Sequence, residues 1–237
     1  MLEGKTILVT GGTGQLGRAV CRELLLHGAT VLTHFRREKK RRELLGFVGD
    51  LAQRRLQLDA VNPLSPEAAQ EWVQSVLSGH DRIHGFVHTL GGIHPKQSVS
   101  RLSPEIWRSQ FVLNLDSAFY MARALLPHFL QHRSGKLVFV SALGGLHGKA
   151  ELAAYSAAKS GLIRLAEALA EETRDQNIQV NVVAPGILKT AENLSWGSEA
   201  DAARWVPPER LAKVIAFLLS PASDDLTGVT IPVPGKM

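Results

Sequence analysis

Short apolar, β-rich runs alternate with stretches of helical periodicity along the chain, and this alternation constrains the fold more than any other feature. The first run, Thr6–Thr10, precedes four glycines between positions 11 and 17, a helical stretch from Arg18 to His27, and a second run, Thr30–Phe35. A strand, a glycine turn, a helix and a strand within about 30 residues form a βαβ unit. The two strands of such a unit are parallel, and the connecting helices cover their faces.

The alternation continues to the end of the chain. It predicts further strands at 55–58, 83–89, 136–141, 179–183 and 229–233, and helices at 66–77, 104–131, 153–175 and 208–219. Pro127 is expected to bend or end the helix at 104–131, because proline lacks the N–H that a helix interior needs. No linker or shift in composition divides the chain. We therefore expect an α/β fold, a single Rossmann-type domain over residues 1–237, with a doubly wound parallel sheet of about seven strands and helices on both faces.

The composition is that of an ordinary globular protein, with 45% hydrophobic and 21% charged residues. The single cysteine, Cys21, excludes an internal disulfide and a CxxC zinc or redox site, and it fits a reducing compartment. The N-terminal residues lack the pattern of a secretory signal, and no apolar stretch approaches the roughly 18 residues of a membrane span. These features predict a cytoplasmic protein without a membrane partner.

The net charge of +5 is concentrated in one segment. Arg36–Arg42 holds six basic residues and one acidic residue, so the remainder of the chain is neutral. A nucleic-acid binder usually spreads basic charge over a face and adds exposed aromatic residues or a known motif, and the sequence shows neither. We expect no nucleic-acid partner. The segment is then either a solvated helix start or a local anion site.

The glycine-rich segment Thr10–Gly17 lies between the first strand and the first helix. Glycines at this place permit a tight turn and let backbone N–H groups approach a pyrophosphate at the helix N-terminus. The second strand ends in Phe35-Arg36-Arg37, with no carboxylate to accept from a ribose 2′-OH. Arginine suits a 2′-phosphate instead. The pattern predicts NADP(H), held by Arg36, as the preferred cofactor, with NAD(H) as the alternative.

Tyr155 and Lys159 are spaced i, i+4 at the start of a predicted helix, which puts them on one helix face. A lysine within about 4–6 Å favours the phenolate and lowers a tyrosine pKa by about 1–3 units. The pair is therefore suited to general acid/base chemistry near neutral pH.

The order of these motifs resembles that of the short-chain dehydrogenase/reductase family over essentially the whole chain. The resemblance includes Asp59 after the third strand, Thr89–Gly92 in place of the family's Asn-Asn-Ala-Gly, Asn114, the segment Asn181–Thr190 and Leu226–Gly228. It implies a proton-coupled hydride transfer between NADP(H) and a carbonyl/alcohol substrate. Tyr155 would be the general acid/base, Lys159 would hold the ribose and favour the phenolate, and Asn114 would hold a water that links Lys159 to solvent.

The resemblance also implies a cofactor site and no metal. Its residues would be Gly11, Thr13, Gly14, Gln15, Leu16, Gly17, Arg36, Asp59, Ala60, Gly91, Tyr155, Lys159, Pro185, Gly186, Ile187 and Thr190. Asp59 would meet the adenine edge. The pocket walls would come from 93–102, 144–152 and 190–206, of which the last is partly apolar. Family members are commonly homodimers or homotetramers, paired through the helices that here are 104–131 and 153–175.

Two departures from the family pattern bear on function. Gln15 replaces a glycine, and Gly14 stands where many NADP-preferring members carry Arg or Lys, so phosphate recognition rests on Arg36. The family's catalytic serine, thirteen residues before the tyrosine, corresponds to Ala142, while Ser141 lies one position earlier. Either the strand ends differently and Ser141 is catalytic, or Tyr155 donates alone. Dihydropteridine reductase, a relative, also lacks this serine.

Two alternatives to a carbonyl reductase therefore stay open. One is an NADP-binding sensor or regulatory protein without turnover, although such a protein is expected to have lost the tyrosine or the lysine. The other is a pterin-type reductase without the catalytic serine. His128 and His132, spaced i, i+4 without an acidic ligand, are expected to be solvated helix residues rather than metal ligands. Cys21 is expected to pack as a small apolar residue.

Overall fold

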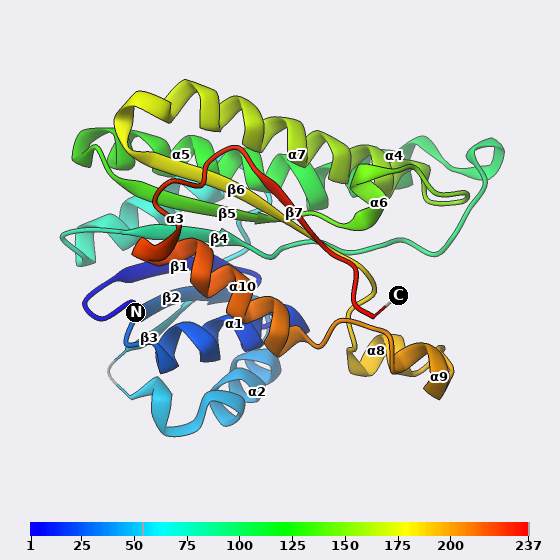
Figure 1. The fold of residues 1–237 in the computed structure, drawn as a ribbon, viewed down its shortest axis with the longest axis horizontal. Coiled ribbons are helices and arrows are strands. Elements are labelled where there is room, and N and C mark those ends of the chain that lie inside the picture. The colour runs from blue at the N-terminus through cyan, green and yellow to red at the C-terminus, as the bar shows by residue number, and fades with distance from the viewer. Residues whose placement is uncertain (54, 237) are drawn as a thin grey trace.

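A parallel sheet runs through the middle of the molecule (Figure 1). The computed structural model describes residues 1–53 and 55–236, and Arg54 and Met237 lie outside the described residues. The seven strands pair in the order β3-β2-β1-β4-β5-β6-β7, and every pairing is parallel. The strands are β1 (Thr6–Thr10), β2 (Thr30–Phe35), β3 (Leu56–Ala60), β4 (Gly85–His88), β5 (Gly135–Val140), β6 (Ile178–Pro185) and β7 (Thr230–Val233).

Helices cover both faces of this sheet (Figure 1). One face carries α1 (Gln15–Leu26), α2 (Glu38–Val48) and α10 (Pro208–Leu219). The other carries α3 (Pro66–Gly79), α5 (Ser117–His132) and α7 (Ala153–Thr173). The remaining helices are α4 (Pro104–Phe111), α6 (Leu143–Leu146), α8 (Ala191–Leu194) and α9 (Glu199–Ala202). This arrangement confirms the predicted doubly wound α/β fold.

The central strands are mostly apolar because both of their faces are buried. Ile7 and Val9 pack into the core on the α1 side, whereas Leu8, between them, packs into the core on the α3 side. The same alternation separates Val31 from Leu32. Side chains of successive strand residues point to opposite faces, so a strand covered on both sides is apolar at most positions.

The chain reverses its direction of growth between β1 and β4, which are neighbours in the sheet. β2 and β3 lie on one side of β1, and β4 to β7 lie on the other. The connections leaving the carboxyl ends of β1 and β4 therefore diverge, and a crevice opens between them. This edge of the sheet is the place where ligands bind in such folds.

The helix expected at 104–131 is interrupted. α4 ends at Phe111, a π-helical turn spans Val112–Asp116, and α5 continues through Pro127 to His132. The expectation that Pro127 ends the helix is therefore wrong. The π turn contains Asn114, and such turns occur where a functional side chain is re-aimed.

The expectation that His128 is solvated is also wrong. Its ring is buried, and Nε2 accepts a hydrogen bond from the Ile83 N–H at 3.0 Å, just before β4. No cluster of three or more His, Cys, Asp or Glu in the described part of the chain is arranged to hold a metal ion. Among the same residues, no helix is long and apolar enough to cross a membrane.

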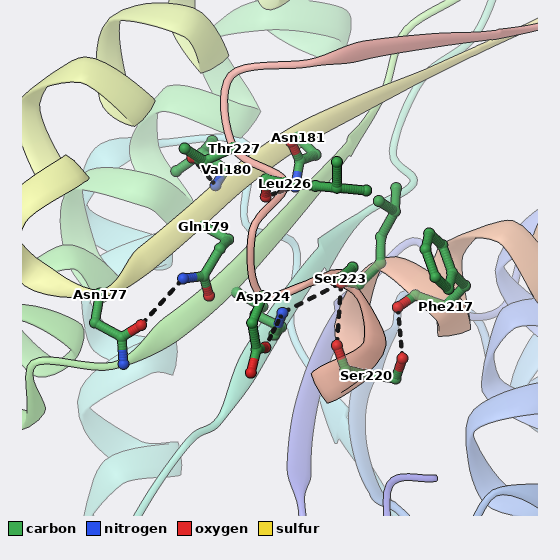
Figure 2. A network of polar contacts seen from close by, with 12 residues as sticks. Asn177, Gln179, Val180, Asn181, Phe217, Ser220, Ser223, Asp224, Leu226 and Thr227 are labelled. Carbon is green, nitrogen blue, oxygen red and sulfur yellow. Dashed lines mark hydrogen bonds and ion pairs between the residues drawn. The ribbon is translucent and has the colours of Figure 1, made fainter.

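A polar network fixes the turn that leads into β7 (Figure 2). The buried Asn181 side chain donates to the Leu226 carbonyl at 2.8 Å and accepts from the Val229 N–H at 3.2 Å. The Thr227 hydroxyl accepts from the Val180 N–H at 3.1 Å. β7 is thereby held beside the end of β6, where the Gly186 N–H donates to the Val233 carbonyl at 2.9 Å. The C-terminal residues thus complete the edge of the sheet.

Substitutions at two glycines, Gly17 and Gly46, test how tightly the backbone packs around each. A Cβ at Gly17 would overlap the Gly11 carbonyl and lie 2.7 Å from the Gly12 Cα, both main-chain atoms, whereas a Cβ at Gly46 in α2 would meet nothing within 4 Å. We expect Gly17→Ala to lower the free energy of unfolding by about 1–3 kcal/mol. Gly46→Ala should raise it by about 0.5–1 kcal/mol, because alanine favours a helix. Urea unfolding measures both, and a Gly17→Ala protein as stable as wild type would contradict this packing.

Candidate active site

The glycine loop joins β1 to α1 by main-chain contacts. Gly11 has a φ of +74°, in the left-handed region that favours glycine, and its carbonyl accepts from the Gly14 N–H at 2.9 Å. Gly17 packs against that carbonyl with no room for a Cβ. No side chain among the described residues caps α1, whose first-turn N–H groups point out of the helix N-terminus. The loop is suited to bind an anion such as a pyrophosphate.

Cys21 and Thr33 lie beneath this loop. A Cβ at Gly12 would overlap the Thr33 hydroxyl and lie 2.9 Å from the Cys21 sulfur. The Thr33 hydroxyl donates to the Val9 carbonyl at 2.7 Å. Cys21 is fully buried, and burial raises the pKa of its thiol to about 12. The thiol therefore fills space, as the sequence predicts.

The basic segment lies where β2 ends and α2 begins. Arg36 and Arg37 are exposed, directly after β2. Further along α2, Arg41 pairs with Glu38 at 2.7 Å and Lys40 pairs with Glu43 at 2.7 Å. Arg36 has no ion-pair partner within the described residues. The segment therefore divides into a paired helix surface and an arginine available to an anion.

Asp59 is the penultimate residue of β3, and both of its carboxylate oxygens accept hydrogen bonds. The Trp72 indole N–H donates to Oδ2 at 2.9 Å, and the Gln57 amide donates to Oδ1 at 3.0 Å. Asp59, Ala60, Phe35 and residues of α2 and α3 line a hollow of about 570 Å³ beside the glycine-loop edge. An adenine that hydrogen-bonded to Asp59 would contact a carboxylate that the Trp72 indole already orients.

Lys159 and Asn114 meet at Gly91, just beyond β4, and Tyr155 lies next to Lys159. A Cβ on Gly91 would lie 3.0 Å from the Lys159 ammonium and 3.0 Å from the Asn114 amide oxygen, so glycine lets the main chain pass between them. The Lys159 ammonium lies 6.0 Å from the centre of the Tyr155 ring. It is buried and donates to the Val140 carbonyl at 2.8 Å.

Asn114 holds the segment after β4 in place. Its amide oxygen accepts from the Gly92 N–H at 3.1 Å, and its amide nitrogen donates to the carbonyls of Gly92 and Gln110, each at 3.0 Å. The side chain is buried within the π turn. Both polar atoms of the side chain are therefore engaged with main-chain groups.

Burial shifts the pKa values of the tyrosine and the lysine in opposite directions. It raises the pKa of Tyr155 to about 12 and lowers that of Lys159 to about 8. Removal from water disfavours whichever form is charged, the phenolate in one case and the ammonium in the other. Burial thus acts on the pKa of Tyr155 in the direction opposite to the lowering that the i, i+4 spacing predicts.

Ser141 and Ala142 occupy opposite sides of an extended segment. The Ser141 hydroxyl is buried and donates to the Lys159 carbonyl at 2.9 Å, on the backbone of α7. Its own N–H still follows the sheet and donates to the Val183 carbonyl at 2.9 Å. Ala142 is extended and half-buried, so its methyl group points away from the Ser141 side. The strand does not shift by one residue at its end.

The segment after β6 forms a separate lobe at the same edge of the sheet (Figure 1). Gly186 lies close to the end of β7, since a Cβ there would be 2.7 Å from the Pro234 carbonyl oxygen. The Thr190 hydroxyl caps α8 by accepting from the Asn193 N–H at 3.2 Å. Ile187 and Trp196 are exposed, and the Trp196 ring lies 5.2 Å from that of Trp205.

The residues predicted for the cofactor follow the carboxyl ends of β1, β2, β3, β4 and β6 or begin α7. The structure thus places them along one edge of the sheet. His34, which the sequence analysis did not single out, lies against the glycine loop and accepts from the Gly11 N–H at 3.0 Å. A histidine close to the end of a strand with a buried-strand pattern was the available signal. His147 is exposed in its loop.

Comparisons with known proteins agree with this arrangement. The family model described as short chain dehydrogenase matches residues 5–201. The chain is 30% identical over 244 residues to the 3-oxoacyl-(acyl-carrier-protein) reductase FabG of Vibrio cholerae, covering 100% of this chain and 98% of that protein. It is 29% identical to the uncharacterized oxidoreductase YciK of Escherichia coli K12, covering 100% and 94%. The solved structure of ElxO with NADP bound superimposes with a TM-score of 0.92 at 21% identity, covering 98% of this chain and 97% of that one.

Proposed function

The chain belongs to the short-chain dehydrogenase family, and on that premise we propose that it is an NADP(H)-dependent oxidoreductase acting on a carbonyl/alcohol substrate. One observation carries the proposal. Lys159 and Asn114 meet at Gly91, and the Lys159 ammonium lies 6.0 Å from the centre of the Tyr155 ring, at the edge of the sheet where α1 begins. The related FabG is named as a reductase of 3-oxoacyl chains, and ElxO is a fold neighbour with NADP bound.

The residues of the edge fit a dinucleotide. Gly11 and Gly17 pack too closely on main chain for a side chain, and α1 has no side-chain cap among the described residues, so the first N–H groups of the helix lack a side-chain partner there. Arg36 is exposed at the place where a 2′-phosphate would lie. These groups would hold the pyrophosphate and the 2′-phosphate, and Ile187, Thr190 and the end of β6 would hold the nicotinamide. Bound there, the cofactor supplies the hydride.

Tyr155 would supply the proton. With a pKa of about 12 the phenol keeps its proton at neutral pH, which suits donation to the oxygen of a carbonyl under reduction. Lys159 would turn from the Val140 carbonyl to the ribose hydroxyls, and its ammonium would then favour the phenolate that donation leaves. Asn114 would hold the water that links Lys159 to solvent.

The position of Ser141 favours the second of the two alternatives that the sequence leaves open. Its hydroxyl is engaged with the Lys159 carbonyl, and Ala142 offers no hydrogen bond. In this proposal Tyr155 is the sole side-chain donor to the substrate oxygen. The same observation favours, as a second candidate, a pterin-type reductase that works without the serine. The exposed apolar side chains of Ile187, Leu194 and Trp196 support a partly apolar substrate.

We also propose that the chain forms homodimers or homotetramers through α4, α5 and α7. Trp107 on α4 and Phe119 on α5 are 40% and 45% exposed, which is unusual for side chains of this size on helices that pack on a sheet.

Replacing Tyr155 by phenylalanine tests the proton donor. We expect Tyr155→Phe to abolish NADPH-dependent reduction while changing the NADPH dissociation constant little, because the ring stays and the proton is lost. Tyr120→Phe, in α5, is the matched control and should retain activity. Substrate panels read at the nicotinamide absorbance give both results. A Tyr155→Phe enzyme that keeps a tenth of wild-type turnover would exclude the role.

Replacing Arg36 by alanine tests the cofactor preference. A charge-assisted hydrogen bond contributes about 1.5–3 kcal/mol, so Arg36→Ala should weaken NADPH roughly 10- to 100-fold and NADH little. Arg42→Ala, a similarly exposed residue of α2, should change neither. Titration of both cofactors by fluorescence decides the matter, and an equal loss for the two would refute the assignment.

The pair Ser141→Ala and Ala142→Ser tests the serine. We expect Ser141→Ala to leave turnover within a few-fold of wild type and to lower stability by about 1 kcal/mol, the worth of a buried hydrogen bond. Ala142→Ser should raise turnover of simple ketones. If Ser141→Ala instead lowered turnover by about 10²–10³, the usual loss of one preorganised donor, with stability and NADPH affinity unchanged, Ser141 would be catalytic.

A further inference from the structure

His34 is a buried polar ring in β2, a strand of the sheet interior. It is the penultimate residue of β2 and only 3% exposed. β2 lies between β1 and β3 in the sheet, and the His34 ring contacts the segments that follow both neighbours. The Gly11 N–H, at the start of the glycine loop, donates to Nε2 at 3.0 Å, and Nδ1 lies 3.0 Å from the Val61 carbonyl oxygen, just after β3.

The two partners determine which nitrogen carries the proton. A backbone N–H only donates, so Nε2 facing Gly11 must be unprotonated. A carbonyl oxygen only accepts, so Nδ1 facing Val61 must carry the proton. The imidazole is therefore neutral, in its Nδ1–H form. Burial supports this state, because it lowers the pKa of His34 to about 4, with Arg36 and Asp59 the charged groups that act on the ring in opposite directions.

The contact with Gly11 sets the start of the loop. Gly11 is the residue with positive φ, and its carbonyl both accepts from Gly14 and carries the close packing of Gly17. The orientation of the peptide before Gly11 is thus linked to the position of the first turn of α1. Without Nε2, the Gly11 N–H would lose the acceptor that holds that peptide.

The contact with Val61 sets the other side of the same edge. Val61 also donates its N–H to the Phe35 carbonyl at 3.2 Å and lines the hollow beside Asp59. The Trp72 ring packs edge-on against His34, with 5.1 Å between ring centres, and its indole N–H orients Asp59. The His34 ring is held by Trp72 from α3 while it bridges two loops.

We propose that His34, as the neutral Nδ1–H tautomer, is a positioning residue that fixes the glycine loop relative to the segment after β3. The glycine loop would bind the phosphates of a dinucleotide and the segment after β3 would bind its adenosine. His34 would hold the two segments at the separation that one dinucleotide requires. This inference rests on the proposed function, because it assigns a further determinant of affinity to the same cofactor site.

Amide and side-chain variants of His34 separate its two contacts. The amide oxygen of His34→Gln reaches the place of Nε2 and keeps an acceptor for Gly11, whereas His34→Asn keeps only a donor near Val61. We expect His34→Leu and His34→Asn to weaken NADPH roughly 5- to 50-fold, and His34→Gln to stay within about threefold of wild type. Fluorescence titration gives the dissociation constants, and urea unfolding gives the stability of each variant.

His84→Leu is the matched control. The His84 ring accepts from the Thr6 N–H at 3.0 Å, the same kind of contact at the opposite end of β1. Its loss should lower stability without changing NADPH affinity. If His34→Leu and His84→Leu behave alike, with lower stability and unchanged affinity, His34 is a structural residue only and the proposal is overturned.

Two measurements need no cofactor and keep this inference separable from the proposed function. The ¹⁵N spectrum of the ring at pH 7 should show a protonated Nδ1 and an unprotonated Nε2, and the reverse tautomer or an imidazolium would overturn the proposal. Hydrogen exchange of the Gly11 and Gly14 amides should be at least about tenfold faster in His34→Asn than in His34→Gln, and equal rates would overturn the proposal too.

If the wild type binds no NADPH, the proposed function fails while these two results still decide whether His34 positions the loop. If His34→Leu does not fold, the Gln and Asn variants carry the comparison.

Discussion

Main chain packs directly on main chain where β1 ends, since Gly17 lies against the Gly11 carbonyl with no room for a Cβ between them. The contact brings the N-terminus of α1 to the edge of the sheet and leaves its first N–H groups without a side-chain cap among the described residues. Thr33 and Cys21 support Gly12 from below, and His34 holds the Gly11 N–H from the side. The anion-binding character of the edge depends on this packing, because helix N–H groups attract a phosphate only when it can approach them closely.

Burial of ionisable groups is the second feature of this edge. Lys159 and His34 are nearly inaccessible, and each is hydrogen-bonded to main-chain atoms rather than paired with an opposite charge. A buried polar group with main-chain partners has a defined orientation, and the atom that carries its proton is defined too, since the sheet fixes the positions of the partners. Burial also lowers the pKa of Lys159 to about 8, which brings it closer to neutral pH than that of an ordinary lysine.

The Ser141–Ala142 pair shows how moving a side chain by one position along an extended segment alters the chemistry of a site. A shift of one position along an extended segment moves a side chain to the opposite face. Here the hydroxyl turns to the backbone of α7 and stabilises the start of the helix that carries Tyr155 and Lys159. The same serine would be a catalytic donor one position later. In this chain the Ser141 hydroxyl is hydrogen-bonded to α7 instead. In the mechanism we propose, Tyr155 is then the only side chain that donates to the substrate oxygen.

The sequence by itself determined the doubly wound sheet, the glycine loop and the helix that carries Tyr155 and Lys159, because hydrophobic periodicity and glycine positions are local properties. It could not determine the π turn at Asn114, the orientation of the Ser141 hydroxyl, the burial of His128 or the bridging role of His34. Each of these depends on which main-chain atoms from distant segments lie within hydrogen-bond distance, such as Gly11 and Val61 on either side of His34. Only the tertiary structure decided them, since strand order brings together atoms that the sequence keeps apart.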